Sequence, residues 1–302
     1  MIIDVRRKTK KVPTLNISVE NIFEAQQGLL DLHDTIASFI NNYGFEPLPE
    51  SIGGRELAEN SYKDLLKTAY SQGHFLFEST ADHVYSLIKL LDGKVPTLSP
   101  YTCLRAGLES AALSCWLLCT EIDAHMRISR CMAFRYEGLL QQLKVARGIN
   151  DGANVAGIKK RITDVEQEAT QLGFRAKYNK KNKIIWITEQ FPSATECIEG
   201  EFGEEVLFRI LSAVAHGRTW ATQQVGFTAP DNDNPTILQK NLSKSGALLL
   251  LSTSAEILTR TAWIRSKLLG HDLEKFTALV NESFIKMGLN GNQASWCSND
   301  TF

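Results

Sequence analysis

Arg209, Ser212 and His216 lie within one mostly apolar segment, Leu207–Trp220, whose sequence is LFRILSAVAHGRTW. On an α-helix, residues 209 and 216 are almost two turns apart, so they share a face, and Ser212 lies between them. An arginine can stabilise phosphate charge, a hydroxyl can orient it, and a histidine can transfer protons near neutral pH. Cleavage of an RNA phosphodiester needs these groups, so the three residues are the candidate catalytic residues.

The same segment also has a structural interpretation. His216 directly precedes Gly217. A histidine followed by glycine is typical of the end of a helix, where the imidazole can bond the last carbonyl groups. Taken alone, the segment favours this capping role over catalysis.

Arg105 and Glu109 form the second candidate site. They are four residues apart, and therefore adjacent on a helix, within the most apolar segment of the chain, 101–120. A charge in such a segment is costly unless it is paired, so we expect Arg105 or another cation to partner Glu109. Two roles stay open. The pair either fixes the helix register or supports the catalytic residues by orienting His216 or an arginine across the bundle.

A basic and aromatic segment, FRAKYNKKNKIIWITE, is the third candidate. Its alternating pattern, with a turn at 179–182, predicts a small β-hairpin near 174–189. Basic side chains beside an aromatic ring can follow a phosphate backbone and stack on a base. The alternative is a solvated edge that lysines keep from aggregating. The residues predicted to bind nucleic acid are Lys177, Lys180, Lys181, Lys183 and Trp186.

The composition limits the classes of function. The chain has 302 residues and a net charge of −1, so any contact with nucleic acid must use a local basic patch. None of its six cysteines forms a CxxC pair, and no closely spaced ligand set predicts a metal site. The sequence lacks the P-loop, GxGxxG, GxSxG and HExxH motifs, which argues against common NTPases, dehydrogenases, α/β-hydrolases and zinc proteases. We therefore expect no cofactor and no metal.

The hydrophobic periodicity predicts an all-α fold, an antiparallel bundle of about seven helices with the small β-hairpin inserted near 174–189. Ser193 is expected to cap a short helix, and Gly270 is expected to end the first of the two closing helices. The main predicted helices before the hairpin cover residues 17–43, 55–91, 101–120, 123–148 and 154–173, and those after it cover 207–216, 241–269 and 271–288.

The predicted domain organisation is an irregular N-terminal arm at 1–16, one helical bundle domain at 17–289 and a tail at 290–302. A boundary within the bundle is possible near 148–152. The basic N-terminus has no apolar stretch after it, so it does not resemble a secretory signal. The longest apolar stretches are too short or too polar to span a bilayer, so we expect a cytoplasmic protein without membrane contact.

Three segments together resemble the HEPN-like helical superfamily. They are an apolar helix with RAGLE, a helix with RISR and a late helix with RILSAVAHG. More narrowly, the chain is similar to uncharacterised bacterial helical proteins in which a core helix ends in LSxxxHG. The superfamily signature is an arginine followed after four to six residues by a histidine, and six residues separate Arg209 from His216. The polar residue that usually follows the arginine is replaced by Ile210.

The resemblance implies a four- or five-helix bundle that often dimerises. Many members are metal-independent ribonucleases of toxin–antitoxin, abortive-infection and other defence systems, and many others are inactive and bind partners or ligands. The leading hypothesis is therefore a homodimer that cleaves RNA, with Arg209, Ser212 and His216 at a composite site supported by Arg105 and Glu109. The alternatives are a non-catalytic helical adaptor with a protein partner, and a bundle that binds a small molecule beside the residues Trp116, Phe134 and Tyr136.

Overall fold

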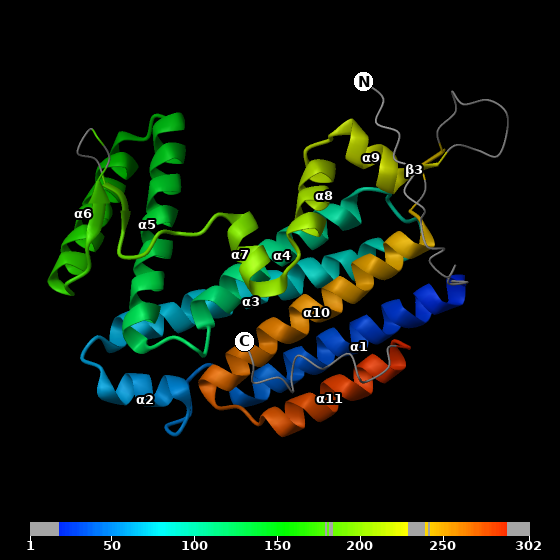
Figure 1. Ribbon diagram of the computed structural model, residues 1–302, viewed down its shortest axis with the longest axis horizontal. Helices are drawn as coiled ribbons and strands as arrows, with labels where there is room; N and C mark the ends of the chain where they lie inside the picture. The colour runs from blue at the N-terminus through cyan, green and yellow to red at the C-terminus, as the bar shows by residue number, and fades with distance from the viewer. Residues whose placement is uncertain (1–17, 179, 181–183, 229–238, 241, 289–302) are drawn as a thin grey trace, which may run out of the picture.

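The computed structural model describes residues 18–178, 180, 184–228, 239–240 and 242–288. This part of the chain is mostly helical (Figure 1), so the all-α class is confirmed. The predicted arm at 1–16 and tail at 290–302 lie outside the described residues. In the part of the chain that the structure describes, no helix combines the length and the apolar character needed to cross a lipid bilayer.

Eleven helices lie in the described residues, more than the seven or so expected. They are α1 (Val19–Tyr43), α2 (Ile52–Glu59), α3 (Lys63–Leu90), α4 (Ser99–Leu118), α5 (Ala124–Gly148), α6 (Gly152–Gln171), α7 (Ala194–Phe202), α8 (Glu205–Ala215), α9 (Thr219–Gly226), α10 (Lys244–Leu269) and α11 (Leu273–Lys286). The short strands are β1 (Ala176–Tyr178), β2 (Ile184–Ile187), β3 (Phe227–Thr228) and β4 (Gln239–Lys240).

Local breaks account for the larger number of helices. The predicted helix 55–91 is divided into α2 and α3. Ser51 starts α2 by accepting a hydrogen bond from the Gly54 N–H, and Asn60 ends it in an extended conformation, with φ −104° and ψ 141°. Periodicity alone does not reveal this break, because the apolar positions continue on both sides of it. Gly203, with a φ of 69°, ends α7 before α8, where the sequence already predicts two separate helices.

The predicted caps at Ser193 and Gly270 are confirmed. The Ser193 hydroxyl accepts a hydrogen bond from the Glu196 N–H, and the Glu196 carboxylate accepts one from the Ser193 N–H, which forms a capping box. Gly270 ends α10 in the left-handed conformation, with a φ of 83°. Terminal signals of this kind therefore locate helix ends more reliably than periodicity does.

The five long helices α1, α3, α4, α10 and α11 lie side by side, and the pair α5 and α6 stands at a steep angle to them (Figure 1). Helices joined by short connections, such as α3 with α4 and α10 with α11, are antiparallel. In contrast, α1, α4 and α10 run in the same direction. Arg265, near the end of α10, donates to the carbonyl of Gly44 just after α1, and Cys115 of α4 contacts Thr261 of α10.

The parallel arrangement differs from the antiparallel bundle that the sequence suggests. Short connections force antiparallel neighbours, but α4 and α10 are separated by all of α5–α9. That long connection returns the chain to the starting end of α4, so α10 lies parallel to it. The direction of α10 relative to α4 depends on the packing of distant segments, and hydrophobic periodicity does not predict it.

Two hydrophobic clusters form the core. The larger cluster joins α1, α3, α4, α7, α8, α10 and α11, and Leu29, Leu32 and Leu108 in it are completely buried. The smaller cluster joins α5, α6 and β2 to α2 and to the ends of α3 and α10. α3 and α10 contribute to both clusters, so they connect the long helices to the α5–α6 pair.

The strands β1 and β2 lie within the range predicted for the hairpin. They pair antiparallel, with Lys177 opposite Trp186 and an irregularity between Lys177 and Tyr178. Residues 179 and 181–183 of the predicted turn lie outside the described residues. The side chain of Ile187, at the end of β2, is buried in the smaller core cluster.

A buried ion pair links α2 to α5. Arg127 is completely buried, and its Nε donates to Glu56 Oε2 at 2.9 Å and its Nη2 to Glu56 Oε1 at 3.0 Å. Arg127 Nη1 donates to the carbonyl of Leu117 at 2.9 Å, and the Tyr70 hydroxyl donates to Glu56 at 2.6 Å. Burial and this carboxylate raise the pKa of Tyr70. Four helices, α2, α3, α4 and α5, therefore meet at one polar network.

Substituting Arg127 by methionine should lower the free energy of unfolding by about 3–5 kcal/mol, because the buried Glu56 carboxylate then loses its counter-ion. Urea denaturation measures this loss. The double variant Glu56→Leu/Arg127→Met should recover part of it. Lys160→Met, which removes an exposed pair with Asp164, is the matched control and should cost less than about 1 kcal/mol. Equal losses in the two single variants, Arg127→Met and Lys160→Met, would contradict this role.

A second buried polar cluster lies where α1 and α10 end. His271 is 4% exposed, and its ring stacks on Tyr43 with centroids 4.7 Å apart. Neither of its ring nitrogens has a hydrogen-bond partner among the described residues. Burial, together with the charge of Arg265, lowers the pKa of His271 from 6.5 to about 4. The folded protein therefore holds this imidazole neutral.

Between pH 6.5 and pH 5 the unfolded chain binds a proton at His271 that the folded chain excludes. The free energy of unfolding should therefore fall with falling pH in this window, by about 1.5 kcal/mol. His271→Phe keeps an aromatic ring against Tyr43 and should remove that part of the pH dependence. Trp220→Phe, at an exposed aromatic residue that carries no titrating group, should leave the pH dependence unchanged. Denaturant titrations at pH 6.5 and pH 5 measure the change in the free energy of unfolding. The same change in His271→Phe as in the wild type would contradict the role of His271.

Candidate functional site

The predicted catalytic residues lie on α8 and at its C-terminal end. The helix buries Phe208, Leu211 and Val214 and packs against α4 and α7. At 3.6 residues per turn, Ser212 and His216 lie within an arc of about 60° from Arg209, and His216 directly follows the last residue of α8. Arg209 and His216 are exposed and Ser212 is half-buried. The structure thus places the three residues along one accessible side of the helix.

Backbone hydrogen bonds alone close the end of α8. Gly217 takes the left-handed conformation, with a φ of 64°. Its N–H donates to the carbonyl of Val214 at 3.0 Å, and the Arg218 N–H donates to Ala213 at 2.8 Å, which is a Schellman motif. The His216 imidazole forms no hydrogen bond with the described residues. The helix end therefore does not use this side chain as its cap.

Arg209 is held by one partner on its own helix. Its Nε donates to Glu205 Oε1 at 2.7 Å, and 64% of the Arg209 side chain remains exposed. An exposed pair at this spacing stabilises a protein by only about 0.3–0.5 kcal/mol. A phosphate could therefore displace Glu205 at small cost, and Glu205 would otherwise keep the guanidinium in place.

The Arg105–Glu109 ion pair lies beside α8. Arg105 Nη2 donates to Glu109 Oε1 at 2.7 Å, and the guanidinium lies over the ring of Phe208, 5.5 Å from its centroid. Both side chains are about one quarter exposed, so the pair lies at the edge of the core. The Arg105 Nε is buried and has no hydrogen-bond partner among the described residues. The structure therefore brings this pair to the helix that carries the candidate residues, but records no direct bond to them.

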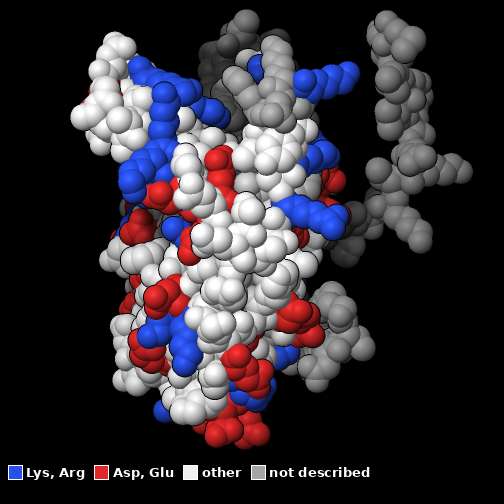
Figure 2. Space-filling view, turned by 90° about the vertical axis from the view of Figure 1, so that its left-hand side faces the viewer, with Lys and Arg blue, Asp and Glu red and all other residues white. Residues whose placement is uncertain are grey.

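The predicted nucleic-acid-binding residues lie elsewhere. The strands β1 and β2 adjoin α5 and α6, at the opposite side of the molecule from α8 (Figure 1). Lys177 and Lys180 are exposed. Lys181, Lys183 and the side chain of Trp186 lie outside the described part. Viewed from the α6 side, lysine and arginine side chains gather in the upper half of the surface (Figure 2). The exposed Lys177 and Lys180 are thus separate from the candidate residues of α8.

The aromatic residues of the small-molecule alternative have different partners. Trp116 and Phe134 both pack against Phe191, with ring centroids 5.9 and 5.8 Å apart. Tyr136 instead donates a hydrogen bond to Glu166 at 3.1 Å. Trp116 and Phe134 thus fill the space between helices, as aromatic residues at helical spacing often do.

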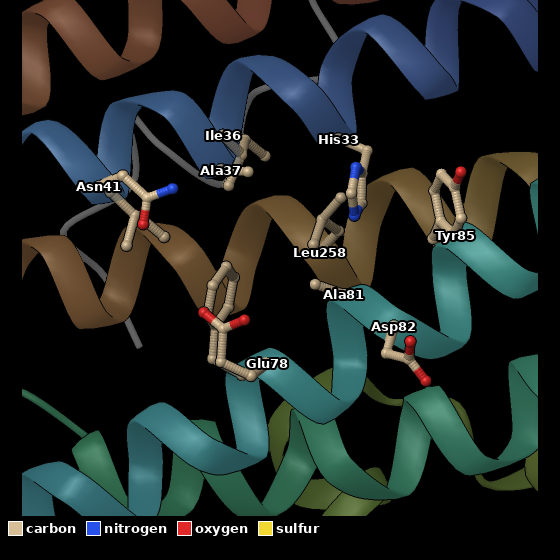
Figure 3. A pocket seen from close by; sticks show the side chains of 11 residues that line it. His33, Ile36, Ala37, Asn41, Glu78, Ala81, Asp82, Tyr85 and Leu258 are labelled. Atoms are coloured by element: carbon tan, nitrogen blue, oxygen red, sulfur yellow. The ribbon is translucent and has the colours of Figure 1, made fainter.

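A groove of about 310 Å³ lies between α1 and α3, with α10 behind it (Figure 3). His33 and Tyr85 lie toward one end and Asn41 toward the other, while Glu78 and Asp82 project from adjacent turns of α3. Two carboxylates would repel a phosphate, so this groove does not suit the predicted chemistry. Among the residues that the structure describes, no three His, Cys, Asp or Glu side chains are grouped so as to hold a metal ion.

The sequence interpretation missed two buried features, the Glu56–Arg127 pair and the neutral His271. Glu56 and Arg127 are 71 residues apart, so no local spacing connects them. His271 directly follows Gly270, and the sequence predicts it only as the first residue of the closing helix 271–288.

Comparisons with models of known protein families, with curated proteins and with solved structures find no match for this chain.

The Schellman closure predicts different effects for two adjacent residues. His216→Ala should leave the melting temperature nearly unchanged, because the imidazole forms no bond that stabilises the helix end. Gly217→Ala should lower the free energy of unfolding by about 1 kcal/mol, because alanine is strained at a positive φ. Thermal and urea denaturation of the two variants test this. A larger loss in His216→Ala than in Gly217→Ala would restore the capping role.

Proposed function

We propose that the protein is a HEPN-like ribonuclease that cleaves RNA at α8 without a metal ion. One observation carries this proposal. The end of α8 is closed by backbone bonds, and the His216 imidazole is exposed on the side of the helix that also carries Ser212 and Arg209. A histidine retained only as a cap would bond the terminal carbonyls. An accessible imidazole on the same side of a helix as a guanidinium and a hydroxyl instead suits proton transfer at a phosphate.

The proposed reaction assigns a role to each group. An imidazole of His216 removes the proton from the RNA 2′-hydroxyl, whose oxygen then attacks the phosphorus. The bond from phosphorus to the 5′-oxygen breaks, and a second acid protonates that oxygen. Arg209 stabilises the negative charge that develops on the phosphate, and Ser212 orients it. The products are a 2′,3′-cyclic phosphate and a 5′-hydroxyl.

A second copy of the chain would complete this site. One imidazole cannot act as base and acid in the same step, and each copy supplies one His216. The exposed side of α8 would face the same side of its partner, so a two-fold axis would bring both histidines and both arginines to one RNA strand. Arg105, stacked on Phe208, would position α8 from behind.

Incubation with an end-labelled single-stranded RNA in EDTA tests the activity. We expect wild-type cleavage to yield cyclic phosphate ends. His216→Ala should reduce the rate by about 10²–10⁴-fold, and Arg209→Ala by about 10²–10³-fold. His125→Ala and Arg147→Ala, at exposed positions away from α8, are matched controls that should retain the wild-type rate. Cleavage that survives His216→Ala would refute the proposal.

Sedimentation of the same samples tests the composite site. We expect a dimer, and we expect an equimolar mixture of His216→Ala and wild-type chains to lose activity in proportion to the mixed dimers. A monomer that cleaves RNA at full rate would retain the ribonuclease and exclude the two-copy arrangement. Complete absence of wild-type cleavage on RNAs of varied sequence would instead favour the non-catalytic adaptor.

A further inference from the structure

The turn that follows α8 carries two exposed side chains that the proposed reaction does not use. Arg218 lies two residues after His216, and Trp220 follows in the first turn of α9. Trp220 is 52% exposed, although tryptophan usually buries most of its surface in a folded protein. A guanidinium and an indole next to a proposed phosphate site are two further groups that can bind a nucleotide.

The packing of α9 turns the Trp220 side chain to solvent. This helix buries Ala221, Thr222 and Gly226. At about 100° per residue, Trp220 lies nearly opposite the middle of that buried face. The indole therefore does not contribute to the core, and its ring is accessible to a ligand.

The short connection keeps Trp220 close to His216. Even a fully extended chain of four residues spans at most about 14 Å between Cα atoms. The turn shortens this span, because the Arg218 N–H donates to the carbonyl of Ala213 at 2.8 Å and returns the chain toward α8. Stacked nucleotides of one strand are about 3.4 Å apart along the axis. An RNA whose phosphate lies at His216 therefore has bases within reach of Trp220.

The charge of this part of the chain suits a polyanion. Residues 206–228 include Arg209 and Arg218 but no aspartate or glutamate. Arg209 is held by Glu205, whereas Arg218 forms no ion pair with the described residues. An exposed tryptophan is also typical of protein interfaces. An unpaired arginine beside it, on a stretch without carboxylates, favours RNA over a protein partner.

From this arrangement we infer that Trp220 and Arg218 select single-stranded RNA as the substrate. The indole would stack on an unpaired base near the cleaved bond, and Arg218 would bind a phosphate next to that base. In a duplex each base is already stacked between its neighbours, so it offers no free face to the indole. The inference rests on the proposed function for the identity of the ligand, and it adds which form of RNA that ligand takes.

Fluorescence anisotropy of a labelled single-stranded RNA in EDTA tests the role of Trp220. His216→Ala serves as the parent protein, so that the RNA stays intact. Adding Trp220→Leu should weaken binding at least about 5-fold because stacking is lost, and Trp220→Phe should retain most of the affinity. Phe75→Leu, at an exposed aromatic residue of α3, is the matched control and should bind like the parent. Unchanged affinity in Trp220→Leu would overturn the inference.

The choice of strand and the role of Arg218 have their own measurements. The same RNA annealed to its complement should bind at least about 10-fold more weakly, and Trp220→Leu should not weaken it further. Arg218→Gln should lower the slope of log affinity against log salt by about 0.7. Arg147→Gln, exposed at the end of α5, should leave that slope unchanged. A duplex that binds as tightly as the single strand would contradict the inference.

Failure of this inference is distinguishable from failure of the ribonuclease proposal. A wild type that cleaves no RNA but binds single strands through Trp220 would refute the ribonuclease and support the inference. A wild type that cleaves RNA, with an unchanged KM in Trp220→Leu, would do the reverse. Sedimentation should give Trp220→Leu the same oligomeric state as the wild type. A dimer lost in this variant would assign Trp220 to a protein interface, and the inference would fail.

Discussion

The arrangement of the helices depends on the buried pair of Glu56 and Arg127. An unpaired charge at this depth would strongly destabilise the fold, so α2 and α5 must meet in one relative position. Arg127 also bonds the carbonyl of Leu117, and Tyr70 bonds Glu56, which fixes the end of α4 and the first half of α3 to the same point. The hydrophobic clusters on either side of α3 then pack around a network that tolerates little sliding.

Such a network sets the limit of what the sequence could predict. The caps at Ser193 and Gly270 and the spacing of Arg105 and Glu109 depend on neighbours within about four residues, and the sequence contains all of that information. The direction of α10 and the pairing of Glu56 with Arg127 depend on segments far apart in the chain. Many apolar faces satisfy the same periodic pattern, so the pattern does not select the partner.

In the candidate site, too, the sequence predicts the local spacing of the residues but not the contacts that depend on the folded backbone. Helical periodicity placed Arg209, Ser212 and His216 along one side of a helix, and the structure agrees with that placement. The sequence could not decide whether His216 caps the helix, because the same residues precede Gly217 in both cases. The backbone bonds of the Schellman motif decide it, and they depend on the conformation of Gly217. Likewise, the end of α4, α7 and the second half of α10 together line a cavity beside Trp263, so no local sequence motif predicts that cavity.

The common direction of α1, α4 and α10 has an electrostatic consequence. Their peptide groups are aligned, so the partial negative charges of three helix macrodipoles accumulate at one end of the molecule. Two buried guanidinium groups lie at that end. Arg265 donates to the carbonyl of Gly44 after α1, and Arg127 donates to Leu117 in the last turn of α4. These arginines thus act as counter-charges to the backbone itself, in addition to the pairing of Arg127 with Glu56.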